Sequence, residues 1–160
     1  MPTVKGREEV AAFFDTLPVE IENKLLRGAA RAGANVIADE AKERTWSDDI
    51  RDGLKVRTRA ATDKVSGVVT VVGHWPRALA TWAEYGTDPH VITTRRGTLA
   101  IEDVPIGRSV RHPGARKEPF LRPALDIKLG EAVAAAQAYI NARVTSGGIV
   151  GADDTGDDEE

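Results

Sequence analysis

The chain has 160 residues and a mass of 17.2 kDa, which suits one domain with its own core. It contains no cysteine, which excludes disulfide bonds, a thiolate nucleophile and any zinc site built from thiolates. The formal net charge is −3, but residues 147–160 hold six acidic side chains and no basic one. The rest of the chain therefore carries a mild positive excess, which is not typical of a nucleic-acid-binding domain.

The N-terminal segment predicts a short docking helix over residues 7–14, with Val10 and either Phe13 or Phe14 on one face before Pro18. It has no apolar run behind a basic start, and no window of the sequence approaches the roughly 20 apolar residues that cross a bilayer. We therefore expect neither a standard secretion signal nor a membrane-embedded protein.

A long amphipathic helix is predicted over residues 18–44, with Thr16 as its cap and Pro18 in its first turn. Many alanines and glycines lie along it, so another element can approach closely, from the same chain or from a neighbouring one. The apolar stripe recurs every three to five residues. It consists of Ile21, Leu25, Ala29, Ala32, Val36 and Ala41.

Two β-like runs and a further helix follow a polar connection at residues 45–53. Residues 54–60 alternate apolar and polar side chains and residues 64–73 are rich in valine, so they predict a hairpin that turns at residues 61–63. Residues 77–85 then carry apolar side chains at helical spacing, and Gly86 is a suitable terminator. The spacing is carried by Leu79, Trp82 and Tyr85.

Residues 88–118 lack helical periodicity and are far longer than an ordinary connection. We expect two short strands within residues 90–101, around Arg95, Arg96 and Gly97, followed by a Pro/Gly/Arg segment that is mobile when free. A final helix is predicted over residues 123–144. Its apolar positions are Leu125, Leu129, Val133, Ala136 and Ile140.

The sequence thus predicts an α+β fold. A long N-terminal helix and a C-terminal helix pack on a small, mainly antiparallel sheet, with a long loop between. We expect one domain over residues 1–146 and an acidic, disordered tail over residues 147–160, because that tail is too polar to bury a core.

Chemical motifs are sparse. His74, His90 and His112 lack metal-ligand spacing, and the acidic cluster of Asp48 and Asp49 is better explained as a solvated turn than as a cation site. No phosphate-binding glycine loop and no serine nucleophile motif occur in the sequence. We therefore expect no enzyme, catalytic residue, cofactor or metal, although a metal-dependent hydrolase that uses these aspartates and a histidine stays open as the third alternative.

Residues 95–122 carry a basic excess, with seven basic and three acidic side chains. They could line a protein interface or touch a phosphate backbone. Phe120 is the one aromatic side chain among them, which does not support base stacking. A protein interface is therefore the first interpretation and DNA contact is the alternative.

Three stretches, "WAEYGT" (82–87), "DPHVITTRRGTLAI" (88–101) and "HPGARKEPFLRPALD" (112–126), together resemble a known family. The chain is similar to the neck and tail-completion proteins of long-tailed bacteriophages, the tail-component family first named in a lambdoid siphophage. The resemblance extends over about residues 18–144, with Asp52 where that family usually has threonine. The matching residues are Glu84, Tyr85, Gly86, Thr87, His112, Pro113, Gly114, Pro119, Phe120, Leu121, Pro123, Ala124 and Leu125.

This resemblance implies a structural virion protein at the head–tail junction that forms a homo-oligomeric ring, a hexamer or a dodecamer, during tail maturation or head–tail joining. Its implied partners are connector or stopper proteins and tail-terminator or tail-tube proteins, with DNA passing through the lumen. The implied location is the virion, and the host cytoplasm during assembly. The expected interface residues are Tyr85, Arg95, Arg96, Arg111, His112, Arg116, Phe120, Leu121 and Arg122.

Pro119 and Pro123 stiffen the backbone on both sides of Phe120 and Leu121, so this apolar pair is held as a fixed anchor. The pair could fill the core of its own subunit or anchor a neighbouring subunit. Both alternatives require the same stiff backbone.

Overall fold

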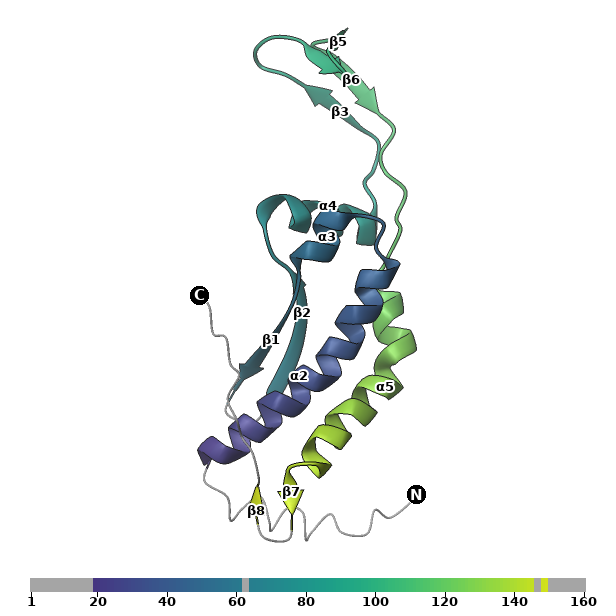
Figure 1. Cartoon of the computed structure of the whole chain (residues 1–160). Coiled ribbons are helices and arrows are strands. Elements are labelled where there is room, and N and C mark those ends of the chain that lie inside the picture. The colour runs from purple at the N-terminus through teal and green to yellow at the C-terminus, as the bar shows by residue number, and fades with distance from the viewer. Residues whose placement is uncertain (1–18, 62–63, 146–147, 150–160) are drawn as a thin grey trace.

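The structure, a computed structural model, describes residues 19–61, 64–145 and 148–149. Two long helices lie side by side, a β-hairpin flanks one of them, and a two-stranded arm projects from the end of this body (Figure 1). The predicted α+β class is confirmed. The expected helix at residues 7–14, the cap Thr16 and the first-turn Pro18 lie outside the described residues.

Helix α2 (Val19–Arg44) is the central element and confirms the long helix predicted from the apolar stripe. Its small residues allow two close approaches within the chain. A Cβ atom at Gly33 would lie 2.8 Å from the carbonyl oxygen of Ala132 in helix α5 (Leu121–Asn141). On the hairpin, a Cβ atom at Gly67 would lie 2.5 Å from the carbonyl oxygen of Ala30. Helix α2 therefore lies between α5 and the hairpin (Figure 1).

The hairpin consists of strands β1 (Leu54–Ala60) and β2 (Val65–Val71), paired antiparallel from Leu54 with Val71 to Ala60 with Val65. This confirms the two predicted strands. The polar connection before them, interpreted as a turn, contains the short helix α3 (Asp48–Gly53). The side-chain oxygen of Ser47 accepts a hydrogen bond from the Ile50 amide at 3.4 Å and so caps it.

Helix α4 (His74–Tyr85) follows the hairpin, and the core gathers between α4, α3, the hairpin and the two long helices. Phe120 and Ile50 are its largest fully buried side chains at this junction. Among the described residues, eight of the thirteen buried apolar side chains are alanines. The core is therefore packed mainly by the close approach of helix and strand backbones, and less by large side chains.

Helix α5 buries a different face from the one its apolar stripe indicates. Leu125, Leu129 and Val133 are 44%, 54% and 62% exposed, whereas Ala124 and Ala132 are buried. The side chains of α2 that face α5 are small, so the alanine face of α5 packs closely against them. The bulky stripe of α5 stays in solvent. In consequence α5 packs mainly on α2, and α2 packs on the hairpin.

The segment predicted as a long loop is a β-arm. Strand β3 (His90–Thr93) pairs with β6 (Ser109–His112), and β4 (Leu99–Ile101) pairs with β5 (Val104–Gly107). Glu102 and Asp103 between β4 and β5 have φ of 48° and 66°, as in the two-residue turns that close hairpins. The arm thus turns there. The two short strands expected around residues 95–97 are confirmed as β3 and β4, which pair with β6 and β5 and not with each other.

The chain ends its described part in a short ladder. Strand β7 (Val144–Thr145) pairs with β8 (Gly148–Ile149). Residues 150–160 of the expected disordered tail lie outside the described part of the chain, and the domain boundary at residue 146 stays a prediction.

Candidate functional site: an arm, its root and an apolar groove

Two of the three stretches that carry the family resemblance, residues 82–87 and 112–126, meet where the arm leaves the body. We call this place, residues 83–87 and 112–122, the root. The Thr87 amide donates to the Ala115 carbonyl at 3.0 Å, and the Ala115 amide donates to the Thr87 carbonyl at 3.1 Å. The Glu118 amide donates to the Ala83 carbonyl at 2.7 Å. Backbone bonds therefore hold both strands of the arm at their base.

Two glycines make this close approach feasible. Gly86 and Gly114 have φ of +73° and +88°, which L side chains rarely adopt. A Cβ atom at Gly86 would lie 2.7 Å from the Ala115 carbonyl oxygen, and one at Gly114 would overlap the Thr87 carbonyl oxygen. The glycines of both motifs thus serve one backbone contact.

Glu84 joins helix α4 to the start of helix α5. Its carboxylate, 9% exposed, accepts hydrogen bonds from three successive amides: Phe120 at 3.0 Å, Leu121 at 3.1 Å and Arg122 at 3.1 Å. The first amides of a helix lack partners within it and carry partial positive charge, so a carboxylate stabilises them. Phe120, at the N-cap position, supplies no cap from its own side chain. Glu84 therefore caps α5 from another helix.

The apolar pair between the prolines lies inside its own chain. The Phe120 side chain is 1% exposed and belongs to the core cluster, and Leu121 packs partly buried against that cluster. Of the two alternatives left open by the sequence, this geometry corresponds to the internal one. Pro119 and Pro123 flank the amides that Glu84 binds, so the stiff backbone presents them to the carboxylate.

At the surface of the root, Tyr85 and Arg122 lie together. The Arg122 guanidinium lies 5.3 Å from the centre of the Tyr85 ring, and its Nη2 atom lies 3.5 Å from the Tyr85 hydroxyl. Tyr85 is 63% exposed. The exposed Arg116 also belongs to the root. This end of the site thus presents an aromatic side chain and cations to solvent.

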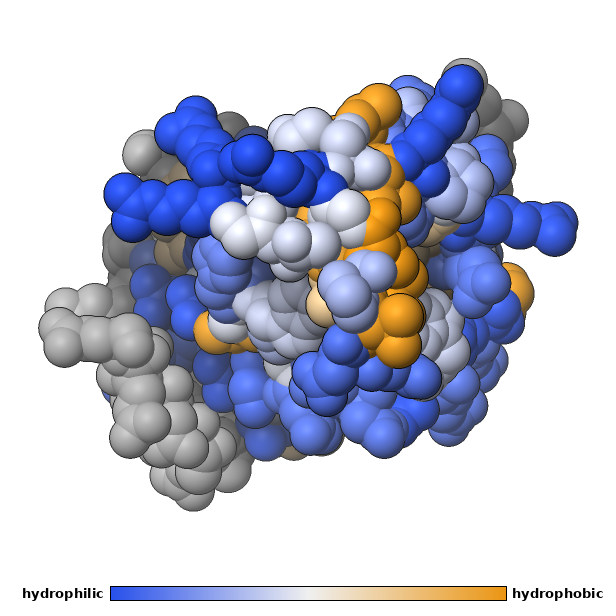
Figure 2. All heavy atoms as spheres, turned by 90° about the horizontal axis from the view of Figure 1, so that it is seen from above, coloured by the Kyte–Doolittle hydropathy of each residue, from blue (hydrophilic) through white to orange (hydrophobic). Residues whose placement is uncertain are grey.

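The arm itself mixes apolar and basic side chains. Arg95 and Arg96 lie between β3 and β4, Arg111 lies on β6, and all three are exposed. His112 on β6 faces His90 on β3, with ring centres 5.0 Å apart. Seen from above the arm, apolar residues form a band with hydrophilic side chains on both sides (Figure 2). The exposed large apolar residues of the arm are Val91, Ile92, Ile101, Val104 and Ile106.

The structure therefore sorts the expected interface residues into two groups. Tyr85, Arg116, Phe120, Leu121 and Arg122 meet at the root, with Phe120 buried there. Arg95, Arg96 and Arg111 belong to the arm, and His112 lies at the end of β6, where the arm meets the root. The apolar arm residues were not predicted as interface residues, because their sequence pattern was interpreted only as that of strands.

An exposed aromatic surface was also missed. All three tryptophans of the chain, Trp46, Trp75 and Trp82, are at least 43% exposed. The rings of Trp75 and Trp82 meet edge to face with centres 5.9 Å apart, and Trp75 Nε1 donates to Asp49 Oδ2 at 3.2 Å. The seven-residue spacing of this pair along a helix was the signal that could have revealed it.

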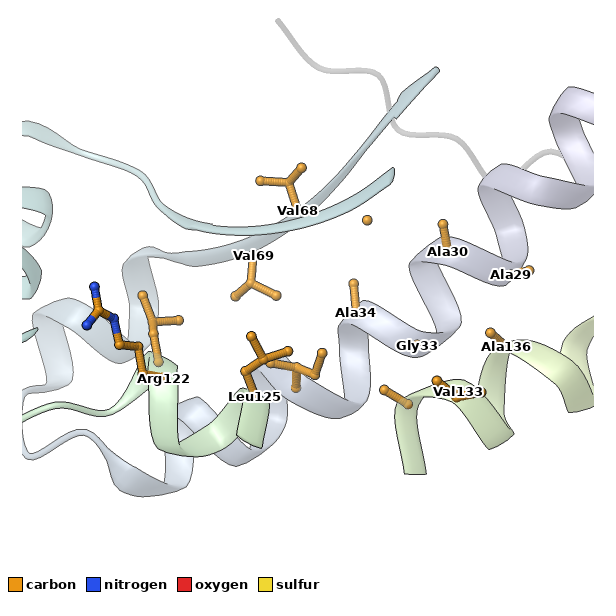
Figure 3. Close-up of a pocket in the computed structure, with 14 residues that line it drawn as sticks. Ala29, Ala30, Gly33, Ala34, Val68, Val69, Arg122, Leu125, Val133 and Ala136 are labelled. Atoms are coloured by element: carbon orange, nitrogen blue, oxygen red, sulfur yellow. The ribbon is translucent and has the colours of Figure 1, made fainter. Parts of the chain in front are cut away.

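An apolar groove of about 490 Å³ opens between β2 and α5, with α2 as its floor (Figure 3). Val69 and Leu125 point toward each other across it, and Ala30 and Ala34 point into it from α2. Its lining combines alanine and glycine with larger aliphatic side chains and one cation, Arg122. Nothing in the sequence pattern indicates this groove, because it results from the packing of α5 on α2.

The aspartates considered for a hydrolase have other contacts. Asp48 pairs with Arg51, and Asp49 accepts the bond from Trp75. Within residues 19–61, 64–145 and 148–149, no three histidine or carboxylate side chains are grouped to hold a metal ion. Over the same part of the chain, no helix combines the length and apolarity needed to cross a membrane.

Residues 8–86 match the model of the family described as "Bacteriophage HK97-gp10, putative tail-component". These residues belong to the HK97-gp10-like family. The resemblance inferred from the sequence is thus confirmed, and this family is one of phage tail components. The match ends at Gly86, so the motif at residues 112–126 lies beyond it, tied to the matched part by Glu84. No curated protein and no solved structure matches the chain.

Proposed function

We propose that this protein is a structural, non-catalytic virion subunit of the phage head–tail connector region that forms a ring by homo-oligomerisation. The observation that carries the proposal is the arm, whose paired strands are held at the root and project from the body (Figure 1). Its large apolar side chains are exposed. Membership of a phage tail-component family supports a tail or neck role. The ring would act in tail maturation or head–tail joining.

The arm suits assembly because its apolar side chains lack cover within the described chain. Ile101 and Val104 are each 62% exposed at the arm's outer hairpin. Large exposed apolar patches rimmed by polar side chains mark interaction sites. A ring forms when one surface of a subunit binds a different surface of the next, and a projecting arm provides the first of these surfaces. Arginine and isoleucine side chains would then meet the neighbouring subunit or an adjacent connector, stopper or tail protein.

The double substitution Ile101→Ser with Val104→Ser tests this proposal. The purified variant is expected to melt like the wild type, because both side chains are exposed, yet to fail in complementation of a phage that lacks the gene. The matched control is Ile127→Ser, which removes a side chain 59% exposed on α5. Imaging of the phage neck and native mass spectrometry of the free protein complete the test. We expect a monomer alone and a ring in the virion, and normal complementation by the arm variant would contradict the proposal.

A second candidate role, contact with DNA through residues 95–122, is favoured by one observation. Four arginines of the arm, Arg95, Arg96, Arg108 and Arg111, are all exposed. Binding through phosphates would weaken steeply with salt, by roughly one logarithmic unit per unit of log salt for each phosphate contact. Replacement of Arg95 and Arg96 by glutamine should then reduce DNA affinity and its salt dependence together. If affinity is absent or independent of salt, this role is excluded.

A further inference from the structure

The groove between β2 and α5 is lined by apolar side chains, with Arg122 as the one charged residue of its lining. We propose that it receives the outer hairpin of the arm, β4 and β5, from a second copy of this chain. The contact rests on the proposed function, because it supplies the second of the two different surfaces through which a ring forms. The arm of one subunit would thus bind the groove of the next.

The groove offers an apolar surface with a cation at one end. Val69 and Leu125 face each other across it, and Arg122 lies one helical turn before Leu125, at the end of the groove nearest the root (Figure 3). Leu125 and Val133 are 44% and 62% exposed, so an occupant would remove apolar surface from water. In the described part of the chain, the exposed Arg122 guanidinium contacts the Tyr85 ring and forms no ion pair.

The outer hairpin of the arm presents the complementary pattern. Ile101 pairs with Val104 across the two strands, so their side chains lie on the same face of the hairpin. Each of the two is 62% exposed. Glu102 and Asp103 form the turn between them, and both are exposed. The hairpin thus ends in two carboxylates directly beside an apolar pair.

The spacing of apolar and charged groups agrees between the two surfaces. Leu125 and Arg122 are separated by about 4.5 Å along the axis of α5, and neighbouring Cα atoms on the hairpin are about 3.8 Å apart. With Ile101 and Val104 seated between Val69 and Leu125, the adjacent carboxylates therefore reach the guanidinium of Arg122. The groove volume of about 490 Å³ gives this apolar pair room. Carboxylate and guanidinium groups form strong, oriented hydrogen bonds, which would fix the direction of the hairpin.

The turn carries its carboxylates in an unfavourable backbone conformation. Glu102 and Asp103 have φ of 48° and 66°, in the left-handed region where glycine and asparagine are the usual turn residues. Acidic side chains at these two positions therefore favour a role for negative charge at the tip of the arm. An isolated two-stranded hairpin is also only marginally stable in water, so binding in a groove would stabilise it.

The groove that receives the hairpin belongs to another copy. The arm projects away from its own body, and backbone hydrogen bonds between Thr87 and Ala115 hold its base (Figure 1). The outer hairpin lies beyond β3 and β6, so it is directed away from the flank of its own chain. A contact between two different surfaces repeats from subunit to subunit, and it closes into a ring when the rotation between neighbours fits.

The absence of cysteine allows a test with engineered thiols. A chain with Val104→Cys and Leu125→Cys is used to complement a phage that lacks the gene, and its particles are oxidised and separated without reductant. We expect a ladder of covalent multimers, whereas each single cysteine should give monomers only. The matched control, Val104→Cys with Ile127→Cys, places the second thiol outside the groove lining, where the native side chain is 59% exposed. It should give at least about tenfold less multimer.

Imaging of the same particles distinguishes failure of this contact from failure of the proposed function. A ring in the neck without the ladder would overturn the contact between arm and groove and leave the proposed function intact. The absence of a ring would overturn both. Dimers from Val104→Cys alone, or its cross-link to another virion protein, would identify a different occupant and would also overturn the contact.

A charge exchange provides a test that needs no engineered thiol. Glu102→Arg with Asp103→Arg should melt like the wild type, because both side chains are exposed. It should lower the titre of the complemented phage by at least about tenfold, because like charges would then meet at Arg122. Adding Arg122→Glu should restore the titre, and circular-dichroism melting verifies the fold of this triple variant. An unchanged titre in the double variant, or no restoration in a folded triple variant, would overturn the contact.

Discussion

Removing the Glu84 carboxylate should loosen the start of α5 and the root together. In Glu84→Ala the buried Phe120 amide loses its acceptor, which costs about 1–3 kcal/mol. The Leu121 and Arg122 amides are part-buried and can regain water, so the loss of their bonds and of the negative charge at the helix start adds about 1 kcal/mol. The free energy of unfolding should therefore fall by about 3 kcal/mol.

At roughly 3 °C per kcal/mol for a domain of this size, this change lowers the melting temperature by about 10 °C. Circular-dichroism melting measures it. Glu84→Gln keeps one acceptor oxygen and should cost about 1 kcal/mol, whereas Glu118→Gln, at an exposed carboxylate nearby, serves as the control and should melt like the wild type. If Glu84→Ala melts within about 1 °C of the wild type, the capping role assigned to this carboxylate is refuted.

Three other substitutions and one deletion have expected outcomes. Phe120→Ala should cost about 3–5 kcal/mol in a melt of the isolated protein, because its side chain is 1% exposed, and a normal melt would show that the core does not depend on it. Gly114→Ala should destabilise the root by at least about 1 kcal/mol and expose the arm to proteolysis, because φ is +88° and the Cβ atom would overlap Thr87. Gly130→Ala should instead stabilise the protein by about 0.5–1 kcal/mol, because a Cβ atom there, in α5, would meet nothing within 4 Å. Deletion of residues 151–160 should leave the melting temperature unchanged, and a large loss would show that this acidic segment contributes to folding.

The elements with strong periodicity could be predicted from the sequence. The stripe of α2, the alternation in β1 and the helical spacing before Gly86 depend on neighbours a few residues apart, which local patterns record. The family motifs were also visible, and residues 8–86 confirm the family. Their physical purpose was not visible, because Glu84 binds amides 36 to 38 residues further along the chain.

The remaining errors have one physical cause, which is that a pattern marks a side chain as apolar without stating what covers it. In α5 the bulky stripe was assigned to the core, but the small residues of α2 accept the alanine face instead. In the arm, the pairing of β3 with β6 depends on where the chain reverses, and Glu102 and Asp103 are not among the strongest turn formers. The groove results from the packing of α5 on α2 beside the hairpin, so the sequence pattern could not predict it.

The root fixes the arm through main-chain bonds, and this separates two kinds of evolutionary constraint. Substitutions at Glu84, Gly86 and Gly114 disturb the backbone contact whatever the arm binds. Residues 91–108 do not take part in this backbone contact. Their substitutions can therefore follow changes in the surface of a partner while the direction of the arm is retained. Homologous chains should therefore be most alike at the root and most divergent in the arm, and exchanging arms between two of them should transfer partner choice without a new fold.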